Sequence, residues 1–174
     1  MPRRPLDAYE TPPHYVQALL DVIGAPTGVV YEPCVGTGCI SALLTDAVVF
    51  TNDIDPDVEA DTHEDAATDG PAWGTLGFDW IITNPPFSLE TEILAQALRW
   101  GKNLAFLARL SFLEPVEDRV ALLQAHPPTG LVVLPRYSFR LNDAGKRATD
   151  SVTCCWLLWQ EKEKPCLTVA SRLS

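Results

Sequence analysis

The sequence predicts a doubly wound α/β fold, in which a mostly parallel, seven-stranded sheet carries helices on both faces. Short apolar runs of strand length alternate with segments in which apolar residues recur at helical spacing. Several of these runs lead directly into glycine, asparagine or aspartate, which are typical of loops. The last two runs have no helical segment between them, so we expect them to form an antiparallel hairpin at one edge of the sheet.

Helices and strands are expected to alternate along most of the chain. Thr11 is the expected N-cap of a first helix, which has prolines in its first turn and ends near Ile23. Apolar residues at helical spacing predict helices over residues 89–100 and 114–125. The polar segment 57–77 predicts a short helix and a weak third strand. Strands are expected over residues 28–31, 47–51, 78–83, 104–110, 130–134 and 152–159, with one more helix over residues 39–45.

The composition is that of an ordinary globular chain, with 174 residues of which 47% are hydrophobic and 21% charged. This length fits one domain, which we expect to span residues 1–174. No apolar run reaches the roughly 18 residues of a membrane span, and no secretory signal opens the sequence, so a cytoplasmic protein with no membrane partner is expected. The five cysteines and three histidines lack metal-ligand spacing, so no metal site is expected.

Charge is divided unevenly along the chain. Residues 1–98 carry a net charge of −14, and residues 99–174 carry +4. A uniformly acidic protein would argue against a nucleic-acid partner, because the phosphate backbone repels negative charge. The mildly basic C-terminal half weakens that argument, while the acidic half also fits an ordinary solvated surface.

Ligands in open α/β sheets bind beyond the carboxyl ends of the strands, and an unusual glycine loop lies at the first of these ends. Gly36 and Gly38 allow the backbone to approach a ligand closely. The lysine of a phosphate-binding P-loop is missing, and the neighbouring Glu32 favours a ligand with an ammonium or hydroxyl group. A tight strand-to-helix turn without a ligand would use the same glycines.

The second loop begins with Asn52 and Asp53 after an apolar strand. An acidic residue at this place in the fold typically holds ribose hydroxyls. Asp53 follows Gly36 by 17 residues, close to the roughly 20 expected in a nucleoside-binding unit. An aspartate-rich turn that caps a helix remains the alternative.

The third loop is Asn84-Pro85-Pro86-Phe87. Its prolines fix the backbone and remove two amide donors, so the carbonyls of Asn84 and Pro85 are available to accept from a ligand. The Asn84 side chain adds another acceptor, and Phe87 adds a flat face. This arrangement suits a planar ring with an amino group, although a proline-stiffened turn alone would have the same sequence.

Together the loops resemble the class I S-adenosylmethionine-dependent methyltransferases, and within them the N6-adenine-specific DNA enzymes. Members carry an NPPF-type motif, here residues 84–87, and a glycine loop that begins Glu-Pro, here residues 32–38. Order and spacing agree, since Asn84 follows Gly36 by 48 positions. Residues 9–12 resemble a further family element, Tyr-x-Thr-Pro, which contacts the methionine part of the cofactor. The resemblance covers residues 8–110 and implies a Rossmann-like sheet.

The resemblance implies S-adenosylmethionine as cofactor and a role for each matching residue. The implied cofactor-binding residues are Tyr9, Thr11, Glu32, Pro33, Gly36, Gly38, Asp53, Ile54, Asp65 and Asn84. Asp53 would accept from the ribose hydroxyls, and Asp65 from the adenine amino group of the cofactor, with Glu64 as the alternative. The implied catalytic residues are Asn84, Pro85, Pro86 and Phe87. Asn84 and the Pro85 carbonyl would bind the target amino group, while Phe87 would stack on the target base.

The target is expected to be adenine in DNA, methylated at its exocyclic N6 by direct transfer. Adenine in ribosomal RNA, a protein glutamine, and a cofactor-binding subunit without activity are the alternatives. Phe87 in place of tyrosine favours a nucleobase over glutamine. Loop 135–150 combines basic and aromatic residues, which suit phosphate contact and base stacking, although a solvated loop would have a similar composition. Its candidate substrate contacts are Arg136, Phe139, Arg140, Lys146 and Arg147.

No segment resembles a target-recognition domain, as in small phage-type members of the family. Four basic side chains in loop 135–150 are too few for strong binding to nucleic acid at physiological salt. We therefore expect modification of low sequence specificity, or a homodimer or partner subunit that completes the nucleic-acid surface.

Overall fold

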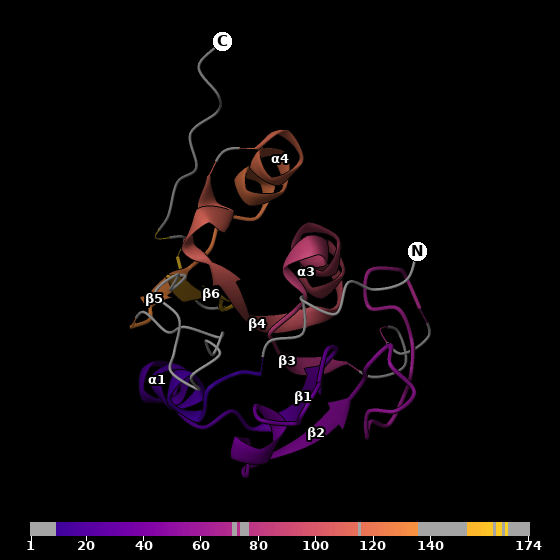
Figure 1. Ribbon diagram of the computed structural model, residues 1–174. Coiled ribbons are helices and arrows are strands. Elements are labelled where there is room, and N and C mark those ends of the chain that lie inside the picture. Colours follow the sequence, from indigo (N-terminus) through magenta and orange to yellow (C-terminus); the bar gives the residue numbers. More distant parts are fainter. Residues whose placement is uncertain are drawn as a thin grey trace, which may run out of the picture.

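The computed structural model contains a six-stranded sheet with the strand order β2-β1-β3-β4-β6-β5 (Figure 1). It describes residues 10–70, 73, 77–114, 116–135, 153–161, 163, 164 and 166. The strands are β1 (Gly28–Glu32), β2 (Ala47–Thr51), β3 (Phe78–Thr83), β4 (Gly101–Arg109), β5 (Gly130–Val133) and β6 (Cys154–Trp159). The pairs among β1 to β4 are parallel, whereas β6 is antiparallel to both β4 and β5. The predicted mostly parallel sheet with an antiparallel hairpin at one edge is confirmed.

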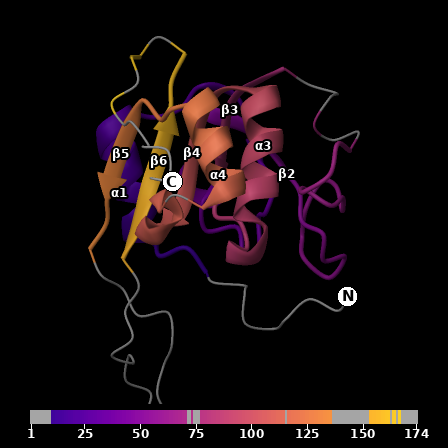
Figure 2. The ribbon, with the colours of Figure 1, turned by 90° about the horizontal axis from the view of Figure 1, so that it is seen from above.

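Helices cover both faces of the sheet (Figures 1 and 2). Helix α1 (Pro13–Ile23) packs on one face, and α3 (Glu90–Trp100) and α4 (Glu117–Ala125) pack on the other. The strands supply both cores because successive side chains point to opposite faces. Val30 packs with the side chains of α1, whereas its neighbour Tyr31 packs with those of α3 and α4.

The helix expected over residues 39–45 is wrong, since only a short 3-10 turn, Ser41–Leu43, forms there. Gly36 and Gly38 adopt positive φ angles of 53° and 75° in the preceding loop. The Ser41 amide donates to the Glu32 carboxylate, and the Ser41 hydroxyl donates to the carbonyl of Gly38. These contacts bind the start of the segment to the glycine loop, which leaves too little chain for an α-helix before β2.

The weak third strand expected within residues 57–77 is also wrong for the described part of that segment. It contains one isolated bridge, between Asn52 and Thr62. Two backbone hydrogen bonds form this bridge, from the Thr62 amide to the Thr51 carbonyl and from the Asp53 amide to the Thr62 carbonyl. The amide of Thr51 donates to the Asp61 carboxylate, so the pairing does not extend beyond the bridge on that side. The described sheet therefore has six strands, where seven were expected.

The first helix begins one residue later than an N-cap at Thr11 requires. Pro12 is the N-cap, and no side chain caps the helix. The Thr11 hydroxyl instead accepts a hydrogen bond from the side chain of Asn84. Helix α1 is fixed by Tyr15, whose hydroxyl donates to the Pro135 carbonyl at 2.6 Å and whose carbonyl accepts from the indole of Trp156 at 2.8 Å.

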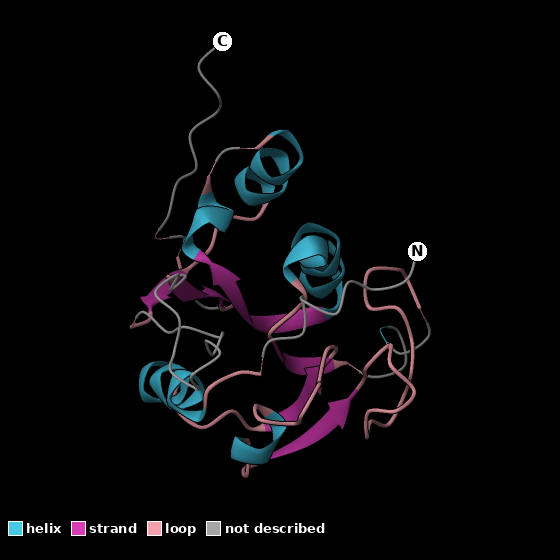
Figure 3. Ribbon diagram, in the orientation of Figure 1, coloured by secondary structure: helices cyan, strands magenta, loops and turns pink. Residues whose placement is uncertain are grey.

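The first four strands end at the same edge of the sheet, because they run parallel to one another. The loops that follow them therefore gather at that edge, and Figure 3 shows irregular chain after both β1 and β2. Within the part of the chain that the structure describes, no helix has the length and hydrophobicity needed to cross a membrane.

Candidate cofactor and substrate site

Asn52 joins the loops that follow β1 and β2, a role that was not predicted from the sequence. Its side chain is completely buried. The amide nitrogen donates to the carbonyls of Pro33 and Glu64 at 2.9 and 3.0 Å. The amide oxygen accepts from the hydroxyl of Thr62 and the amide of Glu64, both at 2.8 Å. These contacts use the full hydrogen-bonding capacity of the side chain, so the glycine loop and residues 62–64 are held in one arrangement. The signal in the sequence was an amide side chain directly after an apolar strand.

Asp53 is held from two sides at the end of the same strand. One carboxylate oxygen accepts from the backbone amide of Gly36 at 3.0 Å, and the other accepts from the amide of Asp55 at 3.0 Å. The residue is 5% exposed. The spacing of Gly36 and Asp53 was read as that of a nucleoside-binding unit, and the structure places the two residues in direct contact. The left-handed backbone at Gly36 and Gly38 explains the glycines, because other residues rarely adopt it.

Glu32 lies beneath the glycine loop and is 1% exposed. Its carboxylate accepts from the backbone amide of Ser41 at 3.0 Å. Burial raises the pKa of Glu32 to about 8, and the nearby Asp53 carboxylate adds to the shift while the Ser41 amide opposes it. Glu32 therefore holds a proton at neutral pH, and a cationic ligand beside it would favour the ionised form.

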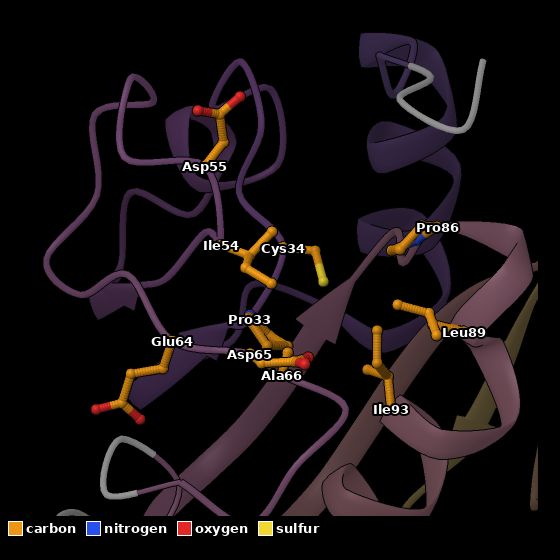
Figure 4. A pocket seen from close by; sticks show the side chains of 10 residues that line it. All are labelled: Pro33, Cys34, Ile54, Asp55, Glu64, Asp65, Ala66, Pro86, Leu89 and Ile93. Atoms are coloured by element: carbon orange, nitrogen blue, oxygen red, sulfur yellow. The ribbon is translucent and has the colours of Figure 1, made fainter. Parts of the chain in front are cut away.

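A cavity of about 480 Å³ opens between the loops that follow β1 and β2 and the start of α3 (Figure 4). It is lined by Pro33, Cys34, Ile54, Asp55, Glu64, Asp65, Ala66, Pro86, Leu89 and Ile93. Four residues predicted from the sequence therefore meet here, namely Pro33, Ile54, Asp65 and Pro86. Apolar side chains on two facing walls form a space suited to a flat, mostly apolar group.

The two acidic candidates in this cavity differ in orientation. The Asp65 carboxylate points into the cavity, whereas the Glu64 carboxylate points away from it (Figure 4). The Glu64 carboxylate lies against Gly70, where an added Cβ would be only 2.6 Å from it. Asp65 is thus the better placed of the two for contact with a ligand. The apolar lining residues Cys34, Ala66, Leu89 and Ile93 were not predicted, because small and aliphatic residues give no distinct sequence signal.

Asn84 follows β3 directly, and its side-chain nitrogen donates to the Thr11 hydroxyl at 3.0 Å. Pro85 and Pro86 are buried after it. The carbonyl of Pro86 accepts from the amide of Leu89, while no hydrogen bond among the described residues ends at the carbonyl of Pro85. Asn84 does not line the 480 Å³ cavity.

Phe87 lies at a second cavity of about 280 Å³. Its other lining residues are Ser88, Glu90, Thr91, Glu92, Arg109, Phe112, Val116 and Arg119. The guanidinium of Arg109 lies 4.5 Å from the centroid of the Phe87 ring. Pro86 and Phe87 are neighbours in the chain, yet they line different cavities. The proline loop, residues 84–87, therefore lies between the two cavities.

Arg109 was not predicted from the sequence. An arginine that ends a buried apolar strand could have revealed it, because such a charge must lie at the edge of the sheet where ligands bind. The candidates Tyr9, Arg136, Phe139, Arg140, Lys146 and Arg147 lie outside the described residues.

Several solved structures that superpose on this chain are methyltransferases, and another, with a TM-score of 0.59 at 14% identity, is a precorrin 8w decarboxylase from Methanobacterium thermoautotrophicum. A type I restriction-modification methyltransferase subunit from Streptococcus thermophilus superposes with a TM-score of 0.65 at 14% identity, over 89% of this chain and 45% of that one. The M protein of the type I restriction enzyme EcoKI gives a TM-score of 0.64 at 13% identity, over 86% and 43%. The 23S rRNA methyltransferase ErmE gives 0.60 at 15% identity, over 92% and 72%.

The chain has the class I methyltransferase fold. It spans less than half the length of the two type I subunits. No protein-family model matches the sequence, and no curated protein matches it. At these identities the structural likeness establishes the fold, while the chemistry must be argued from the residues of the site.

Proposed function

We propose that the protein is an S-adenosylmethionine-dependent methyltransferase that modifies the exocyclic amino group of adenine in DNA. One observation carries this proposal: the Asn84–Phe87 loop separates a cavity with acidic and apolar walls from a second cavity with an aromatic and an arginine side chain. A cofactor on one side of the loop and a target base on the other would each reach it.

The acidic and apolar lining of the first cavity suits a nucleoside cofactor without phosphates. No lysine or arginine occurs between Pro5 and Leu98, so a nucleotide with phosphates would find no cation in these loops. The Asp65 carboxylate lines this cavity and could accept from the amino or hydroxyl groups of a nucleoside. Asp53 and Glu32, which were predicted to hold the ribose hydroxyls and the ammonium group, do not line it and accept from the backbone amides of the glycine loop and its neighbours. The cavity volume of about 480 Å³ lies within the range of small-molecule sites. When bound, S-adenosylmethionine supplies an electrophilic methyl group.

The residues of the loop act by position and electrostatics. The Asn84 side-chain oxygen and the Pro85 carbonyl accept from the two N–H bonds of the target amino group. Acceptors outside the plane of the ring favour a pyramidal nitrogen, whose lone pair is then no longer delocalised into the ring. A well-placed amino group gains reactivity in this way without a separate base. A base within duplex DNA must leave the stack to reach the loop.

The second cavity favours a nucleobase over an amide side chain as the target. Phe87 offers an aromatic ring, and Arg109 lies on one of its faces as a cationic, hydrogen-bonding group. Aromatic and guanidinium groups together suit stacking on a base and contact with its polar edge. Adenine in RNA is the second candidate, supported by the likeness to an rRNA methyltransferase. We further propose that a homodimer or a partner subunit extends the nucleic-acid surface.

Transfer of labelled methyl from S-adenosylmethionine tests the proposal. Duplex DNA, single-stranded DNA, RNA and protein are each incubated with the wild type and with Asn84→Ala, then digested to nucleosides or amino acids. N6-methyladenine from DNA, absent with the variant, is the expected result. Label confined to RNA or to glutamine would overturn the DNA assignment while retaining the methyltransferase. No label in any substrate would overturn the proposed activity itself.

A further inference from the structure

Arg109 is the last residue of β4 and lines the second cavity together with Phe87. Its guanidinium lies 4.5 Å from the centroid of the Phe87 ring. The Nε atom is buried and has no hydrogen-bond partner among the described residues, and none of them forms an ion pair with this side chain. A guanidinium has five N–H donors, and donors that are buried without acceptors cost free energy. The fold therefore supplies a ring for this guanidinium but no acceptor.

The other two arginines that the structure describes both have acceptors. Arg99 forms an ion pair with Asp69 at 3.3 Å. The Nη1 atom of Arg119 donates to the carbonyl of Phe112 at 3.0 Å. Each of these guanidinium groups also lies against an aromatic ring, so a ring contact accompanies hydrogen bonds in this protein and does not replace them. Arg109 differs in having the ring contact alone.

The second cavity has side chains of both signs of charge. Arg109 and Arg119 supply two positive charges, and Glu90 and Glu92 supply two carboxylates. Glu90 is 4% exposed, whereas Glu92 is exposed, and no ion pair of the described residues joins either of them to Arg109. The formal charges cancel, so net charge alone does not select the ligand of this cavity. The hydrogen-bonding pattern of the guanidinium has to select it.

A backbone phosphate suits this donor pattern better than a base edge does. Phosphate oxygens accept and never donate, and two of them match the parallel N–H donors of a guanidinium. Each edge of adenine that carries the amino group places a donor beside the ring acceptor, so it uses only part of the guanidinium. A base that reaches Phe87 has its own phosphate one sugar away. Of the residues that line either cavity only Arg109 and Arg119 are cationic, and Arg119 already donates to the backbone.

We propose that Arg109 binds a backbone phosphate of the target strand, next to the adenine that reaches Phe87. This inference rests on the proposed function, because it names the strand contact of the same site. It assigns Arg109 to substrate binding and gives it no part in the transfer of the methyl group. It also accounts for a cation at the end of a strand whose residues 104–108 are all buried.

Fluorescence anisotropy with a labelled single-stranded DNA that contains one adenine measures binding without methyl transfer. Arg109→Gln removes the positive charge and keeps a polar side chain. Arg99→Gln is the matched control, because Arg99 also lies against a ring but lines neither cavity. We expect Arg109→Gln to raise Kd about tenfold and to lower the dependence of log Kd on log salt by about 0.7. Arg99→Gln should change Kd by less than about threefold.

A neutral methylphosphonate at one linkage at a time identifies the phosphate that is bound. With the wild type, one such substitution beside the adenine should raise Kd about tenfold. With Arg109→Gln the same substitution should change Kd by less than about twofold, because the partner of that phosphate is already missing. The wild-type measurement does not depend on how well the variant folds.

The outcomes separate this inference from the proposed function. Equal Kd values for Arg109→Gln and Arg99→Gln, no sensitive linkage in the wild type, or no binding of the strand by the wild type would overturn the inference even if adenine were methylated. A loss in Arg109→Gln that occurs only with adenine and leaves the salt dependence unchanged would also overturn it, and would assign Arg109 to the base edge. Phosphate-dependent binding without methyl transfer to any substrate would overturn the proposed function and confirm the phosphate contact.

Discussion

The loop after β2 and the loop after β3 lie at the same edge of the sheet, but they are stabilised in different ways. Asn52 and Asp53 are buried and hold the first loop through a network of hydrogen bonds to the chain around them. Residues 84–87 contain two buried prolines, which restrict the backbone, and the Asn84 side chain donates to the Thr11 hydroxyl. The first loop is therefore held by hydrogen bonds of buried polar side chains, whereas the second is stiffened by its prolines.

This difference predicts that substitutions in the first loop mainly affect stability, whereas substitutions in the second mainly affect the reaction. Removal of a network residue leaves several buried partners without hydrogen bonds, so its cost falls on folding. Asn84 is only half-buried, so we expect its removal to affect mainly the rate of the reaction.

Asn52→Ala should lower the free energy of unfolding by about 4 kcal/mol, because it removes a fully buried side chain with four hydrogen bonds to backbone and hydroxyl groups. Urea denaturation followed by circular dichroism measures the loss. Asn103→Ala is the matched control. The Asn103 side chain is half-buried and makes two backbone hydrogen bonds, so about 1 kcal/mol is expected. Equal losses of unfolding free energy in the two variants would show that the hydrogen bonds of Asn52 contribute no more to stability than those of a half-buried asparagine.

Asn84→Ala should reduce kcat about 100- to 1000-fold, equivalent to about 3–4 kcal/mol in the activation free energy. The free energy of unfolding should change by less than about 1 kcal/mol, because the residue is only half-buried. Single-turnover methyl transfer and urea denaturation measure the two quantities on the same preparation. If Asn84→Ala retained more than half the wild-type rate, Asn84 would not be a catalytic residue.

Glu32→Gln should change the pH dependence of stability. Burial raises the pKa of Glu32 from 4.5 to about 8 in the folded protein. Between these values the folded state keeps a proton that the unfolded state has lost, so this group lowers stability as the pH rises from about 4.5 to 8. Glutamine does not ionise, so its contribution to stability does not change over this pH range. At pH 8 the variant should be more stable by about 2 kcal/mol.

Urea denaturation of wild type and Glu32→Gln at pH 5, 6, 7 and 8 checks this prediction. The two stability curves should diverge as the pH rises, and they should be parallel at higher pH, where Glu32 is ionised in both states. Curves that stay parallel between pH 5 and 8 would show that Glu32 ionises normally in the folded protein.

Thr83→Val gives the smallest expected effect. It removes a buried hydroxyl that has no hydrogen-bond partner among the described residues and keeps the shape of the side chain. The free energy of unfolding should stay the same or rise by about 0.5 kcal/mol, because an unsatisfied polar group is replaced by a methyl group. A thermal melt detects this change, and a loss of more than about 1 kcal/mol would reveal a contact of the Thr83 hydroxyl.

Much of the fold was predictable because its strands are short, apolar and bounded by polar loops. Strands β2 and β3 have the predicted bounds. The helix over 39–45 failed because its apolar pattern was local, whereas the contacts of Ser41 with Glu32 and Gly38 belong to the tertiary structure. The N-cap at Thr11 failed for the same reason, since the hydroxyl is bonded to a residue 73 positions away.

Some residues that line the large cavity could be named from the sequence because their chemistry or motif is distinctive, as at Asp65 and Pro86, and their roles stay predictions. Asn52 was named in the sequence without a role, because its four partners come from separate segments. Arg109 and the aliphatic lining of the large cavity depend on which elements pack together. That information lies in the arrangement of the sheet and helices and is absent from any short motif.

Calorimetric titration of S-adenosylmethionine into wild type, Ile54→Ala and Asn84→Ala tests most directly whether cofactor and transfer functions lie in separate loops. Ile54 lines the large cavity and is 42% exposed, so its truncation removes a ligand contact with little structural cost. We expect the wild type to bind, Ile54→Ala to bind about tenfold more weakly, and Asn84→Ala to bind within about threefold of wild type. Absence of binding by the wild type, or a loss in Asn84→Ala as large as that in Ile54→Ala, would contradict this account.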